Sequence, residues 1–279
     1  ARCIKFIDVA SQIGCKSVKF QLFRIEKLFA KEILQKSEKH RNRKEWELPV
    51  EFLKPLSEHA HTKGLQFTCT PFDLEAVEIL EPFVDFYKIA SYELLWDDLL
   101  KACASTGKKV VLSTGMANIE EIKHAVEVLR SEKCNKIILL HCISGYPTPI
   151  DQSNLKAIKT ISEITGCEVG WSDHTVNSGV IHRAIHKWNA KIIEFHLDLD
   201  GHGEEYSSGH CWLPDKIKDV IQQANHGYEA DGDGEKIPVS AEADDRLWRA
   251  DPSDGLRPLK SVRKKIFEPW LFRAKQYKS

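Results

Sequence analysis

Two histidines end consecutive strand-like stretches in the middle of the chain. His174 closes the stretch 167–174, and His196 closes the stretch 191–196, with a helix-like stretch at 180–188 between them. The strands of such a strand–helix–strand unit run parallel, so both histidines would lie at the same edge of one sheet. Neutral imidazoles there could share one divalent ion and leave positions open for substrate oxygens. Each could instead be a hydrogen-bonded core histidine, but their matched positions favour the metal site.

Polar side chains also stand at the ends of the other strand-like stretches. A lysine inside an apolar strand needs a partner, because an unpaired buried ammonium group costs several kcal/mol. One such lysine could belong to a structural ion pair, whereas two at one sheet edge, among hydroxyl groups, favour a phosphate or carboxylate ligand. The polar residues of these ends are Lys19, Gln21, Thr70, Lys88, Ser91, Glu93, Ser113, Thr114, His141, Ser144, Tyr146, Ser172 and Glu194. Together with a metal, this set predicts carbon–carbon chemistry on a phosphorylated or carboxylated substrate.

Strands and helices alternate along the chain, which predicts an α/β fold with a parallel sheet. No glycine-rich nucleotide-binding loop follows any strand. We expect strands at 17–23, 65–70, 86–91, 109–114, 136–142, 167–174 and 191–196. We expect helices at 4–13, 50–63, 74–81, 95–105, 119–131, 154–164, 180–188 and 215–224, with a loop bearing one short helix at 24–47.

Seven strands and an opening helix fit a (β/α)8 TIM barrel that lacks its first strand better than an open doubly wound sheet. A barrel without that strand would expose the apolar edges of the strands at Ser17 and Lys191. We therefore expect the natural protein to carry an N-terminal extension that supplies the strand. We also expect the chain by itself to be poorly soluble or oligomeric and to have little activity.

The composition describes an ordinary globular protein. The 279 residues are 42% hydrophobic and 29% charged, and the net charge of −1 predicts neither nucleic-acid nor membrane binding. The eight cysteines form no CxxC pair, which predicts a reduced, cytoplasmic protein. Residues 1–226 would form the barrel domain, and the polar residues 227–279 an extended C-terminal tail.

Several of these stretches together resemble the N-acetylneuraminate (sialic acid) synthase family. The resemblance spans about residues 1–225, with the motifs in the family's order. The matching strings are Val-Lys19-Phe-Gln21, Thr70-Pro-Phe-Asp73, Tyr-Lys88-Ile-Ala-Ser91, Leu-Ser113-Thr-Gly-Met116, Leu-His141-Cys142, Tyr146-Pro-Thr-Pro149, Ser172-Asp-His174-Thr and Ile-Glu194-Phe-His196. The resemblance implies a homodimeric β/α-barrel transferase that condenses phosphoenolpyruvate with an N-acyl hexosamine such as N-acetylmannosamine. The product would be a nine-carbon 2-keto sugar acid of sialic acid biosynthesis, with release of phosphate.

The resemblance also implies roles for the polar residues. His174 and His196 would hold manganese, with magnesium or cobalt as alternatives, and Glu93 would handle a proton or the attacking water near the reacting carbons. The residues implied to bind the phosphate and carboxylate of phosphoenolpyruvate are Lys19, Thr70, Lys88, Ser91, Ser113 and Ser172. The residues implied to face the sugar are Gln21, Tyr146 and Glu194. Ser144, another substrate-binding residue, stands where the family often has asparagine.

The loop after His196 departs from the family's pattern. The family usually has a Pro-Gly-Pro-Asp-like sequence there, whereas this chain reads Gly-His-Gly-Glu-Glu-Tyr-Ser-Ser-Gly-His-Cys-Trp over residues 201–212. No sugar contact is therefore carried over to this loop.

Other functions stay open at this point. One is another phosphoenolpyruvate-dependent sugar-acid synthase or a pyruvate aldolase, and the other is a non-catalytic relative that binds a sugar or a protein. The presence of both histidines and both lysines argues against the binding protein, because a bare scaffold needs no metal beside an anion pocket.

Overall fold

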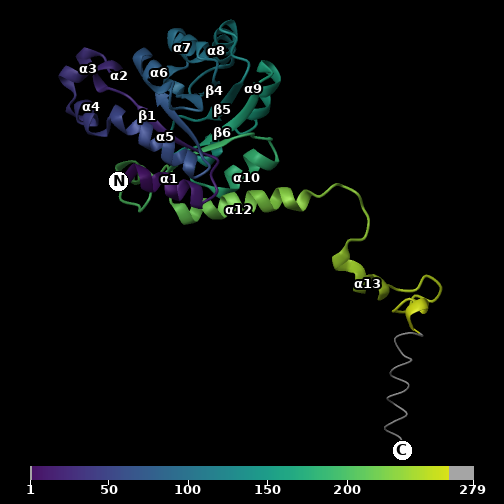
Figure 1. The fold of residues 1–279 in the computed structure, drawn as a ribbon. Coiled ribbons are helices and arrows are strands. Elements are labelled where there is room, and N and C mark those ends of the chain that lie inside the picture. The colour runs from purple at the N-terminus through teal and green to yellow at the C-terminus, as the bar shows by residue number, and fades with distance from the viewer. Residues whose placement is uncertain (1, 264–279) are drawn as a thin grey trace, which may run out of the picture. The chain divides into compact units, whose positions relative to one another are not determined.

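The computed structural model of the protein describes residues 2–263. The chain divides into two compact units, residues 1–228 and 229–279. The first unit contains all the strands of the described residues, and Figure 1 shows them with helices packed around them. The predicted site residues all lie in this unit.

All strand pairs are parallel, as predicted, and they form two sheets. In the first, β1 pairs with β2 from Ser17↔Gln66 to Leu22↔Pro71, and the second has the order β3-β4-β5-β6-β7-β8. The α/β class is therefore confirmed. The strands are β1 (Ser17–Leu22), β2 (Gln66–Pro71), β3 (Phe86–Ile89), β4 (Lys109–Ser113), β5 (Ile137–Cys142), β6 (Glu168–Asp173), β7 (Ile193–Leu197) and β8 (Cys211–Trp212).

Helices follow most strands, as the sequence predicts. The longer ones are α1 (Arg2–Gln12), α5 (Leu53–Thr62), α6 (Leu74–Leu80), α7 (Asp97–Ser105), α8 (Ile119–Ser131), α9 (Ala157–Thr165), α10 (Ser178–His186) and α12 (Pro214–Asp231). Short ones are α2 (Ile25–Leu28), α3 (Lys31–Lys36), α4 (Glu38–Asn42), α11 (Glu204–Ser207) and α13 (Ala243–Leu247). Residues 24–47 thus hold three short α-helices where one was expected.

The predicted helix starts are confirmed at two caps. The Asp73 carboxylate accepts a hydrogen bond from the Ala76 backbone N–H at the start of α6. Asn118 and Glu121 form a reciprocal capping box at the start of α8. Each cap satisfies backbone donors that the first helical turn leaves free, which fixes where the chain turns back from a strand end.

The two sheets adjoin at β2 and β3 without a continuous ladder. The Asp85 N–H donates to the Phe67 carbonyl oxygen at 2.9 Å, and the Thr68 hydroxyl donates to the Phe86 carbonyl oxygen at 2.6 Å. In residues 2–263, no strand pairs with the edge of β1 that lies opposite β2. The described strands thus form part of a parallel barrel wall, and a closed barrel is not established.

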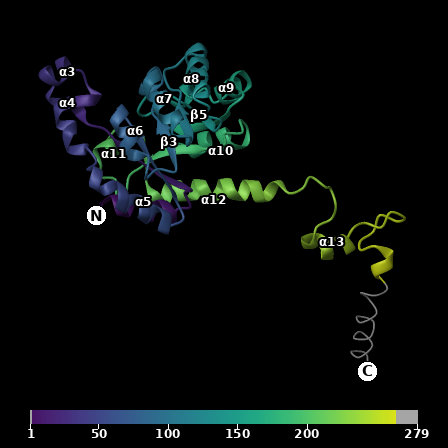
Figure 2. The ribbon, with the colours of Figure 1, turned by 45° about the horizontal axis from the view of Figure 1, so that its top comes forward.

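One strand escaped the sequence analysis. β8 comprises only Cys211 and Trp212, and it pairs with the end of β7 through His196↔Cys211. A two-residue strand has no alternation from which it could be recognised. α12 follows it, extends seven residues beyond the predicted end at 224, and packs Ile217 and Val220 near α10 (Figures 1 and 2).

The described part of the second unit, residues 229–263, is polar and contains α13. Asp254 pairs with Arg263, with oxygen–nitrogen distances of 2.6 and 2.9 Å, and Asp251 accepts the Lys260 backbone N–H at 2.7 Å. The predicted tail runs on to residue 279, and residues 264–279 lie outside the described residues.

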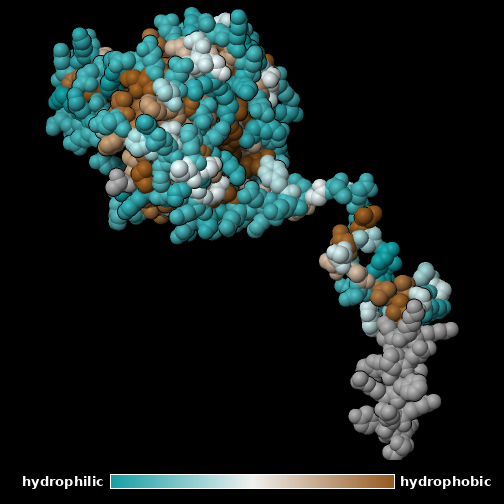
Figure 3. Space-filling model, in the orientation of Figure 1, coloured by the Kyte–Doolittle hydropathy of each residue, from teal (hydrophilic) through white to brown (hydrophobic). Residues whose placement is uncertain are grey.

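Membrane-spanning helices are absent from residues 2–263, since none of their helices is both long and apolar enough. On the face of the first unit drawn in Figure 3, hydrophilic residues predominate around smaller hydrophobic areas.

Asp173, at the end of β6, joins three parts of the fold. Its side chain is fully buried and accepts hydrogen bonds from the indole N–H groups of Trp171, at 3.1 Å, and Trp212, at 2.9 Å. It also accepts bonds from the Thr175 hydroxyl at 2.7 Å and the Val176 backbone N–H at 3.1 Å. One carboxylate therefore fixes β6, β8 and the loop that follows His174.

We expect Asp173→Asn to lower the free energy of unfolding by about 2–4 kcal/mol, because the amide loses the charge and turns an N–H₂ group toward buried donors. Asp219→Asn, an exposed change on α12, should alter it by less than about 0.5 kcal/mol. Urea unfolding measures both values. Equal stability of the two variants would contradict this role.

Candidate active site

A buried ion pair lies at the centre of the strand ends. The Lys88 ammonium group on β3 is 3.6 Å from the Glu194 carboxylate on β7 and donates a 2.7 Å hydrogen bond to the Ser113 hydroxyl on β4. The Ser172 hydroxyl on β6 donates to the same Glu194 carboxylate at 2.8 Å. Four predicted site residues from four strands therefore form one network.

Lys19 extends this network from the first sheet. Its ammonium group on β1 lies 3.9 Å from the second oxygen of Glu194. Gln21 follows two residues later and is exposed to solvent, and Thr70 lies opposite it in the register with β2. The structure thus brings Lys19 to the central carboxylate, leaves Gln21 exposed to solvent and buries Thr70.

The charges of this network depend on one another. Burial opposes ionisation of Glu194, but Lys88, Lys19 and the Ser172 hydroxyl outweigh it and lower the pKa of Glu194 to about 2. Burial lowers the pKa of Lys88, and the Glu194 carboxylate counteracts this. An anionic substrate would be attracted here, because the ammonium groups of Lys19 and Lys88 face only one carboxylate of the protein, that of Glu194.

Gly115, after β4, lets the backbone approach three side chains. An added Cβ there would collide with the hydroxyl oxygens of Ser144 and Ser91 and with the Cys142 sulfur. The Gly115 N–H donates to the Ser91 hydroxyl oxygen at 2.9 Å, and the Ser91 oxygen lies 3.3 Å from the Cys142 sulfur. The predicted residues Ser91 and Ser144 are thereby placed side by side.

Several buried polar atoms of the site have no partner in the protein. Among residues 2–263, five buried side-chain atoms lack a hydrogen bond, and four of them belong to Thr70, Glu93, Ser144 and His210. The fifth belongs to His182 on α10. Because buried polar groups in proteins are nearly always paired, a cluster of unpaired ones near the strand ends indicates a place for a ligand.

The two predicted metal ligands lie close together. The rings of His174 and His196 have centroids 5.3 Å apart, and the Tyr146 ring lies 4.5 Å from that of His174. His174 Nδ1 donates to the Ile143 carbonyl oxygen at 2.8 Å, which leaves Nε2 available as a ligand. Burial, Lys19 and His174 lower the pKa of His196 to about 3, so its imidazole is neutral, as metal binding requires.

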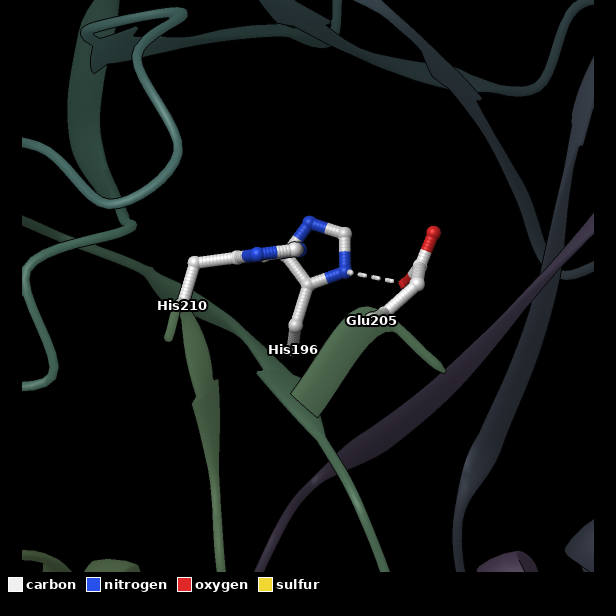
Figure 4. A group of neighbouring side chains, drawn as sticks. All are labelled: His196, Glu205 and His210. Carbon is white, nitrogen blue, oxygen red and sulfur yellow. Dashed lines mark ion pairs between the residues drawn. The ribbon is translucent and has the colours of Figure 1, made fainter. Parts of the chain in front are cut away.

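Two residues that the sequence analysis did not select join His196. Figure 4 shows His196 with Glu205 from α11 and His210 from just before β8. One ligand atom from each of the three lies within 4.8 Å of the other two. The chemistry of this set, two imidazoles and a carboxylate, fits a divalent transition-metal ion. The only sequence signal was a glutamate and a histidine in the atypical loop after His196.

His141 has a structural role instead of a place at the site. Its Nε2 lies 3.0 Å from the Ser153 carbonyl oxygen, and its ring packs on Trp171 at a centroid distance of 5.2 Å. This residue was among the polar strand-end residues, but it is a hydrogen-bonded core histidine.

Surface cavities also occur away from these residues. One of about 730 Å³ lies at the amino ends of β4, β5 and β6, where Lys109, Lys136 and Glu168 line it. Another, of about 390 Å³, lies beside α10, where Asn177 and Arg183 line it. Neither contains a predicted site residue, so the unpaired polar atoms locate the candidate site better than cavity size does.

Fold and site together define a class of protein, a parallel α/β protein with lysines, hydroxyl groups and imidazoles gathered at the carboxyl ends of its strands. The sequence model of the NeuB family matches residues 6–236, and the chain belongs to this family. The resemblance to sialic acid synthases is thereby confirmed.

Known proteins resemble the chain over most of its length. An uncharacterized protein of Methanocaldococcus jannaschii is 40% identical over 243 residues, which are 86% of this chain and 70% of that protein. N,N'-diacetyllegionaminic acid synthase of Campylobacter jejuni is 33% identical over 251 residues, 85% of this chain and 75% of that enzyme. The solved structure of N-acetylneuraminic acid (sialic acid) synthetase from Leptospira borgpetersenii, in complex with citrate, has a TM-score of 0.75 and 28% identity, covering 87% of this chain and 84% of that one. Two of these three relatives are thus named as sugar-acid synthases.

Glu93 should make stability depend on pH. Burial raises the pKa of its carboxyl to about 7, partly opposed by Lys88, from a usual value of 4.5. The folded protein therefore holds this proton to a higher pH than the unfolded chain, and stability falls as pH rises between these two values. Glu93→Gln has no such proton. The free energy of unfolding of Glu93→Gln, taken relative to that of the wild type, should therefore increase by roughly 2 kcal/mol from pH 5 to pH 8.

Urea unfolding at the two pH values measures this difference. Glu78→Gln, an exposed change on α6, serves as the control and should show no such growth. A pH-independent difference between the wild type and Glu93→Gln would show that Glu93 does not titrate in this range.

Proposed function

We propose that the protein condenses phosphoenolpyruvate with an N-acyl hexosamine, N-acetylmannosamine or a relative, to a nine-carbon 2-keto sugar acid and releases phosphate. The observation that carries this proposal is the cluster of unpaired buried polar atoms beside two lysines and the histidines. Such a site suits a substrate with several negative charges and a carbonyl oxygen. The sugar-acid synthases among the relatives support the reaction class.

The charged residues would hold phosphoenolpyruvate. Lys19 and Lys88 would pair with its phosphate and carboxylate, and hydroxyl groups at the same strand ends would donate further hydrogen bonds. These hydroxyl groups belong to Thr70, Ser91, Ser113 and Ser172. Because these donors are fixed by strands, they would stabilise the anion and the charge that develops during reaction without reorganising.

The sugar would lie toward Gln21, Ser144, Tyr146 and Glu194. Glu194 is ionised and already bonded to Ser172, so it offers its remaining acceptor positions to sugar hydroxyl groups. Tyr146 covers the histidine side of the site. A divalent ion at His174 and His196, proposed to be manganese, would act as a Lewis acid on the aldehyde oxygen of the open-chain sugar.

The reaction would proceed through two bond-forming steps. The enol carbon of phosphoenolpyruvate attacks the aldehyde carbon of the sugar, and the oxygen of that aldehyde takes a proton. Water then adds to the cationic former enol carbon, and the tetrahedral intermediate loses phosphate to give the 2-keto acid. Glu93 would accept or donate the proton in these steps, since its pKa of about 7 allows both states near neutral pH.

The described sheets also support a finer proposal about the fold. β1 and β7 both contribute to the site, since Lys19 reaches Glu194, yet no described strand pairs with the edge of β1 opposite β2. We propose that one further parallel strand fits beside β1. Together with β1–β7 it would make the eight strands of a (β/α)8 barrel, with the two-residue β8 lying outside that count. The homodimer and the cytoplasmic location stay predictions.

Phosphate release tests the proposed function. The protein is incubated with phosphoenolpyruvate, manganese and a panel of N-acyl hexosamines, and both phosphate and the product mass are measured. We expect phosphate release that requires one of the sugars, together with a nine-carbon keto acid. A product formed from pyruvate instead of phosphoenolpyruvate would indicate an aldolase, and binding without turnover would indicate a non-catalytic relative.

Lys88→Met tests the anion clamp, because methionine keeps the volume and removes the charge. We expect the dissociation constant of phosphoenolpyruvate to rise by ~10-fold or more, since a charge-assisted hydrogen bond contributes about 1.5–3 kcal/mol. Lys19→Met should have the same direction of effect. Lys101→Met, on the exposed side of α7, is the control and should bind as the wild type does. Calorimetric affinities that are equal for all four proteins would refute the clamp.

A further inference from the structure

The loop between β7 and β8 brings two potential ligands to His196. It spans residues 198–210 and contains α11, which carries Glu205. Glu205 Oε2 lies 3.7 Å from His196 Nδ1, and the rings of His196 and His210 have centroids 5.0 Å apart. The pairing of His196 with Cys211 explains why His210 lies beside His196, since it is the residue just before this β8 partner.

His210 points to a ligand independently of Glu205. Only 6% of His210 is exposed, and its Nδ1 has no hydrogen-bond partner. Its ring packs against Tyr146, with centroids 4.9 Å apart, and lies 6.3 Å from that of His174. An unpaired buried imidazole nitrogen lowers the stability of the fold. A bound ligand would remove this cost by supplying the missing partner.

The loop that presents Glu205 is anchored at its start. The buried Asp198 carboxylate accepts hydrogen bonds from the backbone N–H groups of Asp200, at 3.0 Å, and Gly201, at 2.7 Å. Gly203 packs so closely on Asp198 that an added Cβ would collide with the carboxylate. α11 therefore begins at a fixed place, while the Glu205 side chain itself is 62% exposed and free to turn.

The spacing fits one ion after a small movement. Ligands on opposite sides of an ion, each roughly 2.0–2.2 Å from it, lie about 4.2 Å apart. The three ligand atoms lie within 4.8 Å of one another, close to that span, and the exposed Glu205 side chain can turn toward the two imidazoles.

We infer that Glu205 and His210 bind the same divalent cation as His196, so that the loop 198–210 forms part of the metal site. This inference rests on the proposed function for the role of the cation. His174 does not belong to this group of three, although its ring centroid lies 5.3 Å from that of His196. A site with three protein ligands would bind its metal without waiting for phosphoenolpyruvate.

Manganese binding without substrate tests this inference. The dissociation constant of Mn²⁺ is measured by electron paramagnetic resonance on the metal-free protein, for the wild type, Glu205→Gln and His210→Ala. We expect each variant to raise this dissociation constant at least ~10-fold. Even replacing a residue that only hydrogen-bonds to a metal ligand typically weakens metal binding by about 10-fold or more. Glu204→Gln and His202→Asn change exposed residues of the same loop and should leave it within about twofold.

The variants separate this inference from the proposed function. Wild-type Mn²⁺ affinity in Glu205→Gln and His210→Ala, with loss of affinity in His174→Ala and His196→Ala, would overturn the inference and leave the proposed histidine pair in place. Unchanged affinity in all four would overturn the metal site of both. If His210→Ala fails to fold, as circular dichroism would show, Glu205→Gln decides alone, because that change lies at the surface.

Discussion

The buried carboxylate of Asp173 is the constraint on which the site depends. Asp173 lies between two residues of the site in the sequence. Ser172 bonds to Glu194, and the ring of His174 packs against that of Tyr146. The bonds of Asp173 to the indoles of β6 and β8 tie the strand that ends at His174 to the strand that follows His210. Because a fully buried charge must be completely paired, the positions of its donors are nearly fixed. His174, which follows Asp173, and His210, two residues before Trp212, are therefore held in fixed positions as well.

A second buried carboxylate, Glu194, determines the charge of the site. Two lysines and a serine hydroxyl outweigh its burial, so it remains an anion between Lys88 and Lys19. Without it, two ammonium groups in a buried site would repel one another and lose hydration. With it, the net charge of the three groups is still positive. The same arrangement therefore stabilises the fold around the two lysines and leaves an attraction for an anionic substrate.

Most of the fold could be predicted from local patterns, whereas the metal site could be predicted only in part. Alternating apolar residues and the caps at Asp73 and Asn118 located most of the strands and longer helices, although the end of α12 was predicted seven residues too early and β8 was missed. Lys88 was identifiable because a charge inside an apolar strand requires partners, though which partner, Glu194, depends on strands far apart in the sequence. His210 and Glu205 gave no comparable signal. They reach His196 through a two-residue strand and a four-residue helix, which form because of tertiary contacts and not because of local preference.

The distribution of satisfied and unsatisfied polar atoms separates structure from function in this protein. His141 and His210 are equally buried, at 6% exposure, and both lie near strand ends. His141 bonds to a backbone carbonyl oxygen and packs on Trp171, so its environment accounts for it fully. His210 Nδ1 has no partner, and the same holds for atoms of Thr70, Glu93 and Ser144 from three other parts of the sheet. A fifth such atom, on His182, lies on α10, whereas the other four lie near the site, where a ligand would supply the missing partners.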